Sequence, residues 1–521
     1  MKKIYVFAVA ALMALQARAQ NVSLDTYIGA QLGTEDLNGT ARFVGMGGAM
    51  DALGADISTI STNPAGMGLF RHSQVSGSFG LVSQSEGKSF QNGSKTNASF
   101  DQLGVVFSTR TGMHSYINFG FNFHKNRNFN HVLSVASQAV NGSSQNRQTA
   151  IKGVLGDLDH SYGESQVDNL YDAMITDKDN NNIMYTYDAR DYQFNRAQTG
   201  YIGEYDLNLS GNIKNRVYLG VTVGIRDVHY NSYTEYSENL MPVVDEDITY
   251  VGMRDNHKIT GWGFNVKGGI IVRPVEESPF RLGLTVHTPT FYKLTTNNVS
   301  SIHDHIGMVK EVRSDADFRF NTPWRFGLSA GHTVGNYLAL GVGYEYADYG
   351  SIDMRSISSS GYSWDGYYYE HSDSDPAMKS LTERTLRGVS TLKLGAEYKV
   401  DPNISVRLGY NYLSPMYKES GVRDQTIDSP GTYMASTTDY TNWKDTHRIT
   451  AGVGFSFDQF RLDLAYQYST RQGDFYPYMN GVSAQYQEAE SGQNVTLTNE
   501  CRPVSVKDNR HQLLCTLSYS F

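Results

Sequence analysis

Four arginines have the side chain and the setting needed to bind an acidic group: Arg325, Arg407, Arg448 and Arg461. Each lies on the polar side of a stretch in which apolar and polar residues alternate. A guanidinium group presents paired N–H donors that match both oxygens of a carboxylate. The four arginines are therefore candidate contacts for an acidic ligand. The alternative is that they pair with acidic residues of the chain, such as Glu397.

A second group of residues carries the oxygen ligands that calcium prefers. Asp177, Asp179, Asn181 and Asp188 occupy places 1, 3, 5 and 12 of a twelve-residue stretch, as in a calcium-binding loop. Asn182 stands at the sixth place, where such loops have glycine, and an aspartate stands at the last place, where they have glutamate. A hydrophilic loop tip is therefore the preferred interpretation, and the sequence predicts no cofactor.

Aromatic residues in a polar stretch are candidates for receiving a hydrophobic molecule outside the cell. Trp364, Tyr367 and Tyr368 lie close together within residues 354–383, which do not alternate. Packing within a loop, or a place in the aromatic ring at a membrane surface, is the alternative. No Ser/His/Asp arrangement is recognisable in the sequence, and we expect a protein that is not an enzyme.

β-strands must position these residues, because alternation of apolar and polar residues is the main pattern of the chain. In residues 404–412 and 460–468, every second residue is apolar and the residues between are small or polar. The connections between such segments are alternately short and long, which is typical of bacterial outer-membrane barrels. Fourteen segments are predicted to be strands: 72–84, 98–110, 115–129, 199–213, 215–231, 256–273, 279–295, 318–333, 336–353, 384–400, 403–418, 443–457, 459–474 and 506–521.

The composition excludes a helical membrane protein and a disulfide-rich scaffold. Of the 521 residues, 40% are hydrophobic and 19% are charged. A helical span needs about 20 consecutive apolar residues, and the longest apolar run, 4–15, is shorter. The only two cysteines, Cys501 and Cys515, would lie roughly 40 Å apart in an extended chain, so we expect no disulfide.

Both ends of the chain carry signals of export. Residues 1–19 combine a basic start, an apolar run and the Ala17-Arg18-Ala19 cleavage pattern of a secretory signal peptide. Loss of its three basic residues changes the formal net charge from −9 to −12, which gives no support for nucleic-acid binding. At the other end, the alternating residues 513–521 finish with Phe521, which resembles the C-terminal assembly signal of bacterial outer-membrane barrels.

Residues 20–71 do not alternate like strands, and they contain three motifs in a fixed order. Gly45–Ala49 reads GMGGA, Asp56 precedes Ser58, and Asn63–Gly66 reads NPAG. This order closely resembles the N-terminal hatch of the FadL/TodX family of outer-membrane transport proteins. The stretches FNTPWRFG (320–327), STLKLGAEY (390–398) and VRLGYNYLSP (406–415) also resemble the family, so the resemblance covers essentially the whole mature chain.

The resemblance implies an all-β membrane protein, a monomeric 14-stranded antiparallel transmembrane β-barrel (72–521) with a hatch (20–71) inside the lumen. It implies passive transport of long-chain fatty acids or aromatic hydrocarbons across the outer membrane, with hatch movement and lateral release near a kinked third strand. The expected partners are a hydrophobic small molecule, outer-membrane lipid and the barrel-assembly machinery, with both termini in the periplasm. The hatch residues implied in gating are Gly45, Gly47, Gly48, Asn63, Pro64, Ala65 and Gly66.

Two other functions remain open on the sequence. A relative of the family serves as a cell-surface shuttle in a protein-secretion system, so the same fold could bind proteins instead of small molecules. A haem-binding outer-membrane receptor is the third hypothesis.

Small residues on the inward side of the predicted strands give a structural test of the hatch. Glycine weakens a strand and is tolerated where another backbone approaches closely. We therefore predict that residues 41–69 contact these positions, the alternative being that the glycines ease barrel curvature. The positions are Gly104, Gly120, Gly220, Gly283, Gly331, Gly341, Gly395, Gly409, Gly454 and Ala465.

Overall fold

The computed structural model describes residues 26–139, 142, 176–177, 183–184, 188–241, 250–304, 308–423, 439–478, 480, 482–487 and 494–521. The predicted signal peptide, residues 20–25 of the predicted hatch, and Asp179 and Asn181 of the candidate calcium stretch lie outside the described residues. Within the described chain, the dominant element is one large antiparallel sheet.

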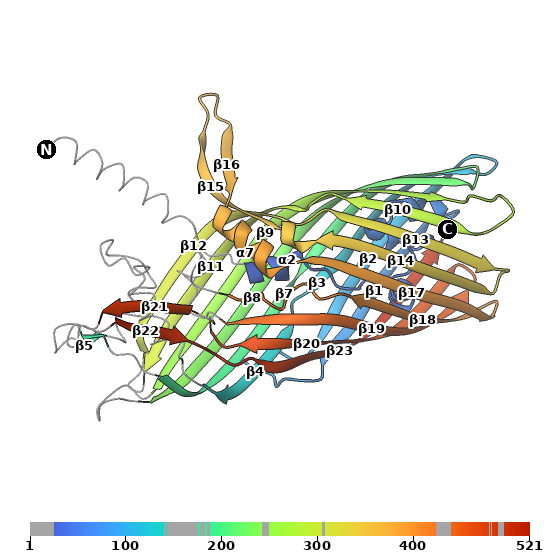
Figure 1. Cartoon of the computed structure of the whole chain (residues 1–521). Helices are drawn as coiled ribbons and strands as arrows, with labels where there is room; N and C mark the ends of the chain where they lie inside the picture. Colours follow the sequence, from blue (N-terminus) through green and yellow to red (C-terminus); the bar gives the residue numbers. More distant parts are fainter. Residues whose placement is uncertain are drawn as a thin grey trace.

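The sheet closes into a barrel of fourteen antiparallel wall strands, as predicted (Figure 1). Closure joins β1 (Gln74–Gln84) to β23 (Val504–Ser520), so most of the wall backbone is hydrogen-bonded between neighbouring strands. The wall strands between them are β2 (Thr96–Gly112), β3 with β4 (Ser115–Asn128, His131–Gln138), β7 (Asp188–Ile213), β8 (Val217–Met241), β9 (Tyr250–Val272), β10 with β11 (Arg281–His287, Phe291–Asp304), β12 with β13 (Met308–Asn321, Arg325–Val334), β14 (Leu338–Asp348), β17 (Gly388–Asp401), β18 (Ile404–Leu413), β19 (Tyr440–Phe457) and β20 (Phe460–Tyr476).

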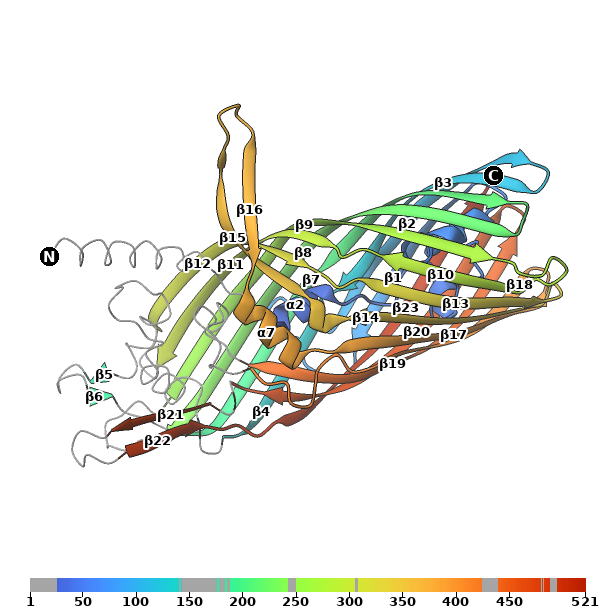
Figure 2. The same ribbon diagram turned by 45° about the horizontal axis from the view of Figure 1, so that its top comes forward.

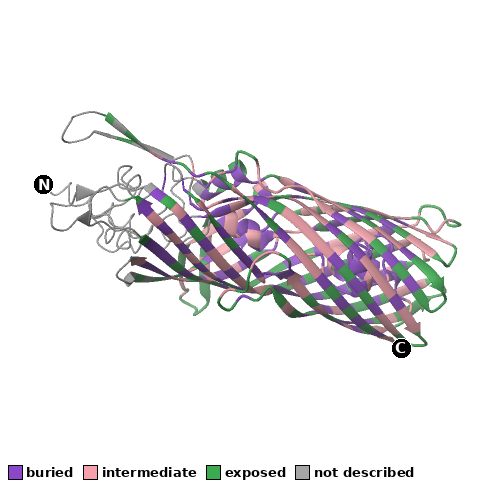
Figure 3. Ribbon diagram, turned by 90° about the horizontal axis from the view of Figure 1, so that it is seen from below, coloured by how far each residue is buried: buried purple, intermediate pink, exposed green. Residues whose placement is uncertain are grey.

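The outer face of the wall carries an apolar band. Along β8, Leu219, Val221 and Val223 point outward and are exposed. Gly220 and Thr222, which lie between them, point inward and are buried. Figure 3 shows this alternation of exposed and buried residues on many strands. Exposed aromatic residues border the band on the side of the long loops and on the side of the short turns. The first group includes Trp262, Phe264, Phe291, Trp324, Phe326, Tyr344 and Tyr346, and the second includes Phe107, Phe457, Phe460 and Phe521.

The wall strands extend further than the sequence predicted. β8 continues to Met241 and β9 begins at Tyr250, so most of the predicted loop 232–255 belongs to the wall. The prediction was wrong there because beyond the apolar band the outward face becomes polar, while apolar residues such as Leu240 and Val251 point inward. The predicted loop 354–383 contains the hairpin of β15 (Asp353–Tyr362) and β16 (Tyr368–Ser374), followed by α7 (Pro376–Thr385).

Short elements occupy the remaining long connections. β5 (Thr176–Asp177) and β6 (Ile183–Met184) pair within the longest connection, and β21 (Val482–Gln487) pairs with β22 (Asn494–Asn499). A 3-10 turn, η4 (Tyr349–Ser351), links β14 to the β15–β16 hairpin. Cys501 is buried and Cys515 is exposed, and both are free, as predicted.

The hatch lies inside the barrel (Figures 1 and 2). Its elements are α2 (Thr26–Gly33), α3 (Ala41–Gly45), α4 (Thr59–Thr62) and η2 (Pro64–Leu69). Most of the hatch lies in the half of the barrel that holds the C-terminus, whereas α2 lies towards the long loops and packs beside α7. No helix among the described residues is long and apolar enough to cross a membrane.

The acidic motif of the hatch has a clear local role. The hydroxyl of Thr40 caps α3 by accepting a hydrogen bond from the Phe43 N–H (3.1 Å). Thr40 in turn donates to the Asp56 carboxylate (2.8 Å), which also accepts from the Ser58 N–H (3.0 Å). Asp56 therefore joins the two ends of the segment 40–58, which contains the GMGGA motif.

The predicted contact between inward glycines and the hatch is confirmed at eight positions. A Cβ added at Gly104, Gly120, Gly220, Gly283, Gly331, Gly341, Gly395 or Gly409 would lie 3.0 Å or less from a hatch atom. The tightest case is Gly341, where the Ala49 carbonyl oxygen would be 1.9 Å away. Ala465 packs in a cluster with hatch residues. Gly454 is the exception, because the side chains of Asp463 and Arg407 fill the space in front of it.

The third wall strand is broken at residues 129–130. β3 pairs with β2 only as far as His124, opposite Gln102, and β4 continues along β7 alone. At the same level, the first residues of β2 pair with β1 in the described sheet. The hatch bridges this break, because the Asn38 amide donates to the Asp101 carboxylate (2.9 Å) and to the Lys125 carbonyl (3.1 Å).

Candidate functional site

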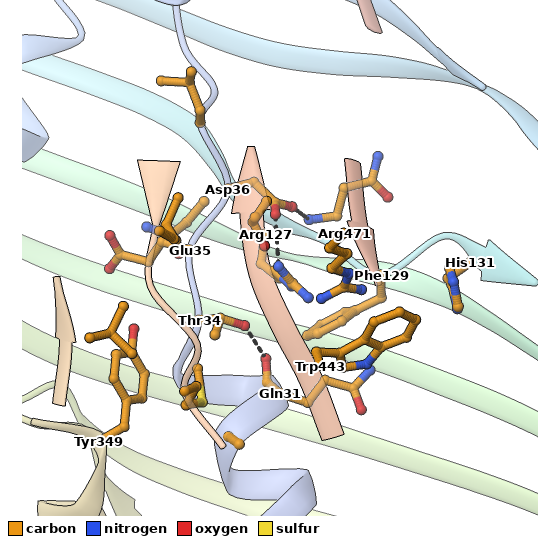
Figure 4. Close-up of a pocket in the computed structure, with 18 of the residues that line it drawn as sticks. Gln31, Thr34, Glu35, Asp36, Arg127, Phe129, His131, Tyr349, Trp443 and Arg471 are labelled. Atoms are coloured by element: carbon orange, nitrogen blue, oxygen red, sulfur yellow. Dashed lines mark hydrogen bonds and ion pairs between the residues drawn. The ribbon is translucent and has the colours of Figure 1, made fainter. Parts of the chain in front are cut away.

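A cavity of about 320 Å³ lies inside the barrel, over the upper part of the hatch. One side of the cavity is formed by the hatch between Tyr27 and Asn38, and the other sides are formed by wall strands and by residues 413–423. Figure 4 shows hatch residues Gln31, Thr34 and Asp36 facing side chains from the wall. The fold therefore brings N-terminal residues and distant strands together around one cavity.

An arginine cluster lines one side of the cavity. Its members are Arg127, Arg448, Arg471 and Arg510. Two carboxylates lie among them: Asp36 of the hatch, 2.7 Å from Arg127, and Asp508 of β23, 2.8 Å from Arg471 and 3.1 Å from Arg510. Four guanidinium groups thus share two carboxylates.

Arg448 is the member of the cluster that forms no ion pair within the described chain. Within the described chain, its one side-chain partner is the amide oxygen of Asn411, 3.0 Å from Nη1. Burial by itself would raise the pKa of Asp36, but Arg127, Arg510 and Arg448 outweigh burial and hold that pKa below its usual value. All three arginines therefore act on the same small region of the cavity.

Apolar and aromatic side chains lie beside the arginine cluster. Tyr27 of the hatch stacks on Tyr417 with 5.4 Å between ring centroids and packs against Tyr440 at 5.1 Å. The guanidinium of Arg471 lies 4.1 Å above the ring of Trp443. Phe129, Leu133, Leu413 and Met416 complete this apolar side. The cavity offers an apolar wall beside a positive one.

A second charged group holds the hatch from the opposite side. Glu35 pairs with Arg226 of β8 and with Arg325 of β13. The positive charges are matched there, because Arg226 also pairs with Glu204 (3.1 Å) and Arg325 with Glu345 (3.3 Å). This group is consequently a structural anchor with little capacity to attract a further anion.

The ion pairs of Glu35 should make the stability of the protein depend on pH. Burial by itself would raise the pKa of Glu35, but Arg325 and Arg226 outweigh it and hold the pKa well below its usual range. A depressed pKa stabilises the fold fully above the ordinary glutamate value of about 4.3, and this contribution is lost as the pH falls through the depressed range. We expect Glu35→Gln to lower the thermal unfolding midpoint at neutral pH and to reduce its fall on acidification.

This expectation is tested by measuring the thermal unfolding midpoint by circular dichroism from neutral to acidic pH. Glu311→Gln is the control, because Glu311 forms an exposed pair with Arg313 and should leave the pH dependence unchanged. Identical acid profiles for the wild type and Glu35→Gln would contradict a role for Glu35 in holding the hatch.

The four arginines predicted from the sequence divide between two places. Arg448 and Arg325 line the cavity. Arg407 and Arg461 lie outside it, beneath the hatch, where Glu397 and Asp463 pair with both. Arg42 of the hatch joins them through Glu397 (2.8 Å). Arg407 and Arg461 therefore follow the alternative given for these arginines, because they pair with acidic residues of the chain.

Sequence reasoning missed three members of the arginine cluster. Arg471 and Arg510 lie at inward-facing positions of the alternating pattern of their strands, so this pattern could have identified them. Arg127 could not have been found in this way, because a β-bulge between Lys125 and Arg127 inserts one residue and turns Arg127 inward.

The candidate gating residues of the hatch are closely packed. Gly47 has φ +61°, and a Cβ there would lie 2.7 Å from the Tyr410 nitrogen, so glycine is required. Asn63 is fully buried, donates to the Asp51 carbonyl (2.8 Å) and accepts from the Ala65 N–H (3.2 Å). The remaining members, Gly45, Gly48, Pro64, Ala65 and Gly66, lie in the same two segments, and the role of all seven residues in gating stays a prediction.

Within the described residues, neither metal candidate has a complete site. Of the candidate calcium residues, Asp177 ends β5 and Asp188 begins β7, and this site stays a prediction. In the described chain, His124, Glu204 and Asp206 come together as possible ligands, but Lys267 Nζ lies 2.8 Å from Glu204 and 2.9 Å from Asp206. The Lys267 ammonium group already pairs with both carboxylates, and Arg226 pairs with Glu204 as well.

The aromatic residues proposed from the sequence to receive a hydrophobic molecule lie away from the cavity. Trp364 stands in the turn of the β15–β16 hairpin, and Tyr367 and Tyr368 follow it. None of these three residues lines the cavity, and all three are exposed. They form a separate surface on the outside of the barrel.

Comparison with known proteins gives structural likenesses only. No protein-family model and no curated protein matches the chain. A Pseudomonas aeruginosa FadL homologue shares 14% identity over 94% of this chain and 100% of its own, with a TM-score of 0.49. The Ralstonia pickettii toluene transporter TbuX shares 12% (93% and 99% covered, TM-score 0.48), and the Pseudomonas putida toluene transporter TodX shares 13% (94% and 99%, TM-score 0.47).

Proposed function

We propose that this protein is a passive outer-membrane channel for small hydrophobic molecules that carry an acidic group, such as long-chain fatty acids. The observation that supports this most directly is the cavity itself, which places the arginine cluster beside an apolar wall. The outward apolar band is the surface that a membrane would cover. Transport down a concentration gradient needs only binding and release.

The charge balance of the cavity favours an acid over a neutral hydrocarbon. The four guanidinium groups of the arginine cluster face two carboxylates, Asp36 and Asp508, which leaves positive charge in excess. A ligand carboxylate would pair with Arg448 without displacing an existing ion pair. Phe129 and Leu133 would then cover the hydrocarbon chain.

Lateral release at the broken third strand is the second part of the proposal. Asn38 closes the break and belongs to the hatch segment that also carries Glu35 and Asp36. A shift of that segment would withdraw Asn38 from Asp101 and Lys125 and open a way between β2 and β4. The resulting route would lead from the cavity into the membrane, with the long loops outside the cell and the C-terminus in the periplasm.

A cross-link across the break should slow uptake. The Lys125 ammonium group donates to the Ser99 hydroxyl (2.6 Å), so cysteines at these two positions could be joined by a short bis-maleimide. We expect the cross-linked Ser99→Cys/Lys125→Cys protein to retain fatty-acid binding but to lose uptake in cells. Ser99→Cys alone and Lys125→Cys alone, treated in the same way, control for modification alone, including that of the native Cys501 and Cys515. Undiminished uptake after complete cross-linking would place the exit elsewhere.

Identifying the molecules that co-purify with the barrel tests the proposed function. The protein is purified from its native membrane in a lipid-free detergent, extracted with solvent and analysed by mass spectrometry. Enrichment of fatty acids or other amphipathic acids over bulk lipid is expected. A haem absorbance band would favour the haem receptor, and an empty lumen with co-purifying secreted proteins would favour the protein shuttle.

A further inference from the structure

The β15–β16 hairpin stands out sideways from the barrel wall. Figures 1 and 2 show it projecting away from the wall, whereas the other strands run along the barrel. Its base is fixed to the barrel, because Asp353–Ser356 pair with Asn321–Phe318 of β12. Glu370 of β16 also pairs with Arg319 and with Lys293, 3.1 Å away on β11. The base of the hairpin is therefore continuous with the barrel wall and is fixed to it by strand pairing and ion pairs.

The tip of the hairpin is rich in exposed aromatic residues. Five of the eight residues from 362 to 369 are Tyr or Trp, and the exposed fractions of Trp364, Tyr362 and Tyr367 are 99%, 76% and 75%. Tyr362 and Tyr368 pack edge to face at 5.4 Å, so part of the tip is ordered within itself. Asp365 is the one charged residue in this stretch. A two-stranded hairpin is only marginally stable in water without further packing.

The base of the hairpin lies at the upper border of the apolar band. Asn321, which pairs with Asp353, is also the partner of Phe291, one of the exposed aromatic residues of that border. Lys293, which holds Glu370, lies two residues beyond Phe291 on the same strand. A hairpin that leaves the wall sideways at this level runs along the plane in which a membrane surface meets water.

We propose that the β15–β16 hairpin is a membrane anchor whose aromatic tip lies in the interface of the outer leaflet, beside the barrel. Tyrosine and tryptophan concentrate at membrane–water interfaces because their rings are apolar and their N–H or O–H groups stay hydrated. The hairpin continues the aromatic border of the barrel outward, so one lipid interface covers both. This placement does not depend on what the barrel carries.

Tryptophan quenching measures where the tip lies. The full-length protein is placed in phosphatidylcholine nanodiscs with either ordinary or brominated acyl chains. The emission of Trp364 is obtained as the difference between the wild type and Trp364→Phe, which keeps the fold because the side chain is exposed. Two further differences serve as controls: Trp324 lies on the lipid face of the wall, and Trp443 lines the cavity.

The expected result is that brominated chains remove most of the Trp364 emission, as they do for Trp324, and leave Trp443 emission unchanged. Acrylamide, a water-soluble quencher, should affect Trp364 only weakly in nanodiscs and more strongly in detergent. Equal Trp364 emission in ordinary and brominated nanodiscs would overturn the proposal. If acrylamide then quenched it strongly, the tip would stand in water, as a surface for a protein partner would.

Discussion

Replacing Arg448 by glutamine is expected to weaken the binding of a long-chain fatty acid by about 10- to 150-fold. A hydrogen bond to a charged group contributes about 1.5–3 kcal/mol, and every 1.4 kcal/mol is a factor of ten in affinity. Arg448 holds no ion pair in the described chain, so its removal strands no buried carboxylate. Isothermal titration of the purified barrel with hexadecanoic acid measures the change.

Arg461→Gln is the matched control for this experiment. It removes the same charge from the same barrel, but Arg461 lies outside the cavity, and Arg407 continues to pair with Glu397 and Asp463. We expect its affinity to equal that of the wild type. If Arg461→Gln weakened binding as much as Arg448→Gln, the acid would be bound by overall charge and not by the arginine cluster.

Gly269→Ala is expected to unseat the hatch and make the barrel leak ions. A Cβ on Gly269 would lie 2.1 Å from Asn63 Oδ1 and 3.1 Å from both the Ala65 nitrogen and Pro64 Cδ. Asn63 is locked by its hydrogen bonds to Asp51 and Ala65, so it has no free rotamer to adopt. Overpacking of this kind costs about 1–3 kcal/mol, which would raise the population with a displaced hatch by about 5- to 150-fold.

The neighbouring glycine provides the control. Gly268 points to the outer face, and the nearest atom to an added Cβ there is the Val286 carbonyl oxygen at 3.9 Å. Conductance in planar bilayers should therefore rise for Gly269→Ala and stay at the wild-type level for Gly268→Ala. Equal conductance of the two variants would mean that contact between the wall and the NPAG turn does not keep the barrel closed.

The parts of the fold that alternation could predict are those in contact with lipid on one side. The strand β18, for example, alternates from Ile404 to Tyr412 because lipid selects one face and the lumen the other. Where lipid ends, the outward face of the same strands becomes polar, as in β8 beyond Asn231, although burial still alternates there. Inward glycines such as Gly341 were informative for a related reason, since the hatch backbone lies directly against them.

The cavity was only partly predictable, because its residues meet through closure of the barrel and through one irregularity. Asp36 and Arg510 are separated by most of the chain and meet only because β23 closes on β1. Arg127 turns inward at a β-bulge that no periodic pattern reveals. The sideways course of the β15–β16 hairpin likewise depends on its pairing with β12, which alternation cannot indicate.

A crystal structure of the barrel soaked with an ω-bromo long-chain fatty acid tests the central claim most directly. The bromine gives an anomalous signal at one end of the ligand, and the electron density shows the carboxylate at the other. We predict the carboxylate against Arg448, within the arginine cluster, and the hydrocarbon chain along Phe129 and Leu133. A cavity free of bromine signal, or an acid bound with its carboxylate away from the four arginines, would contradict the account.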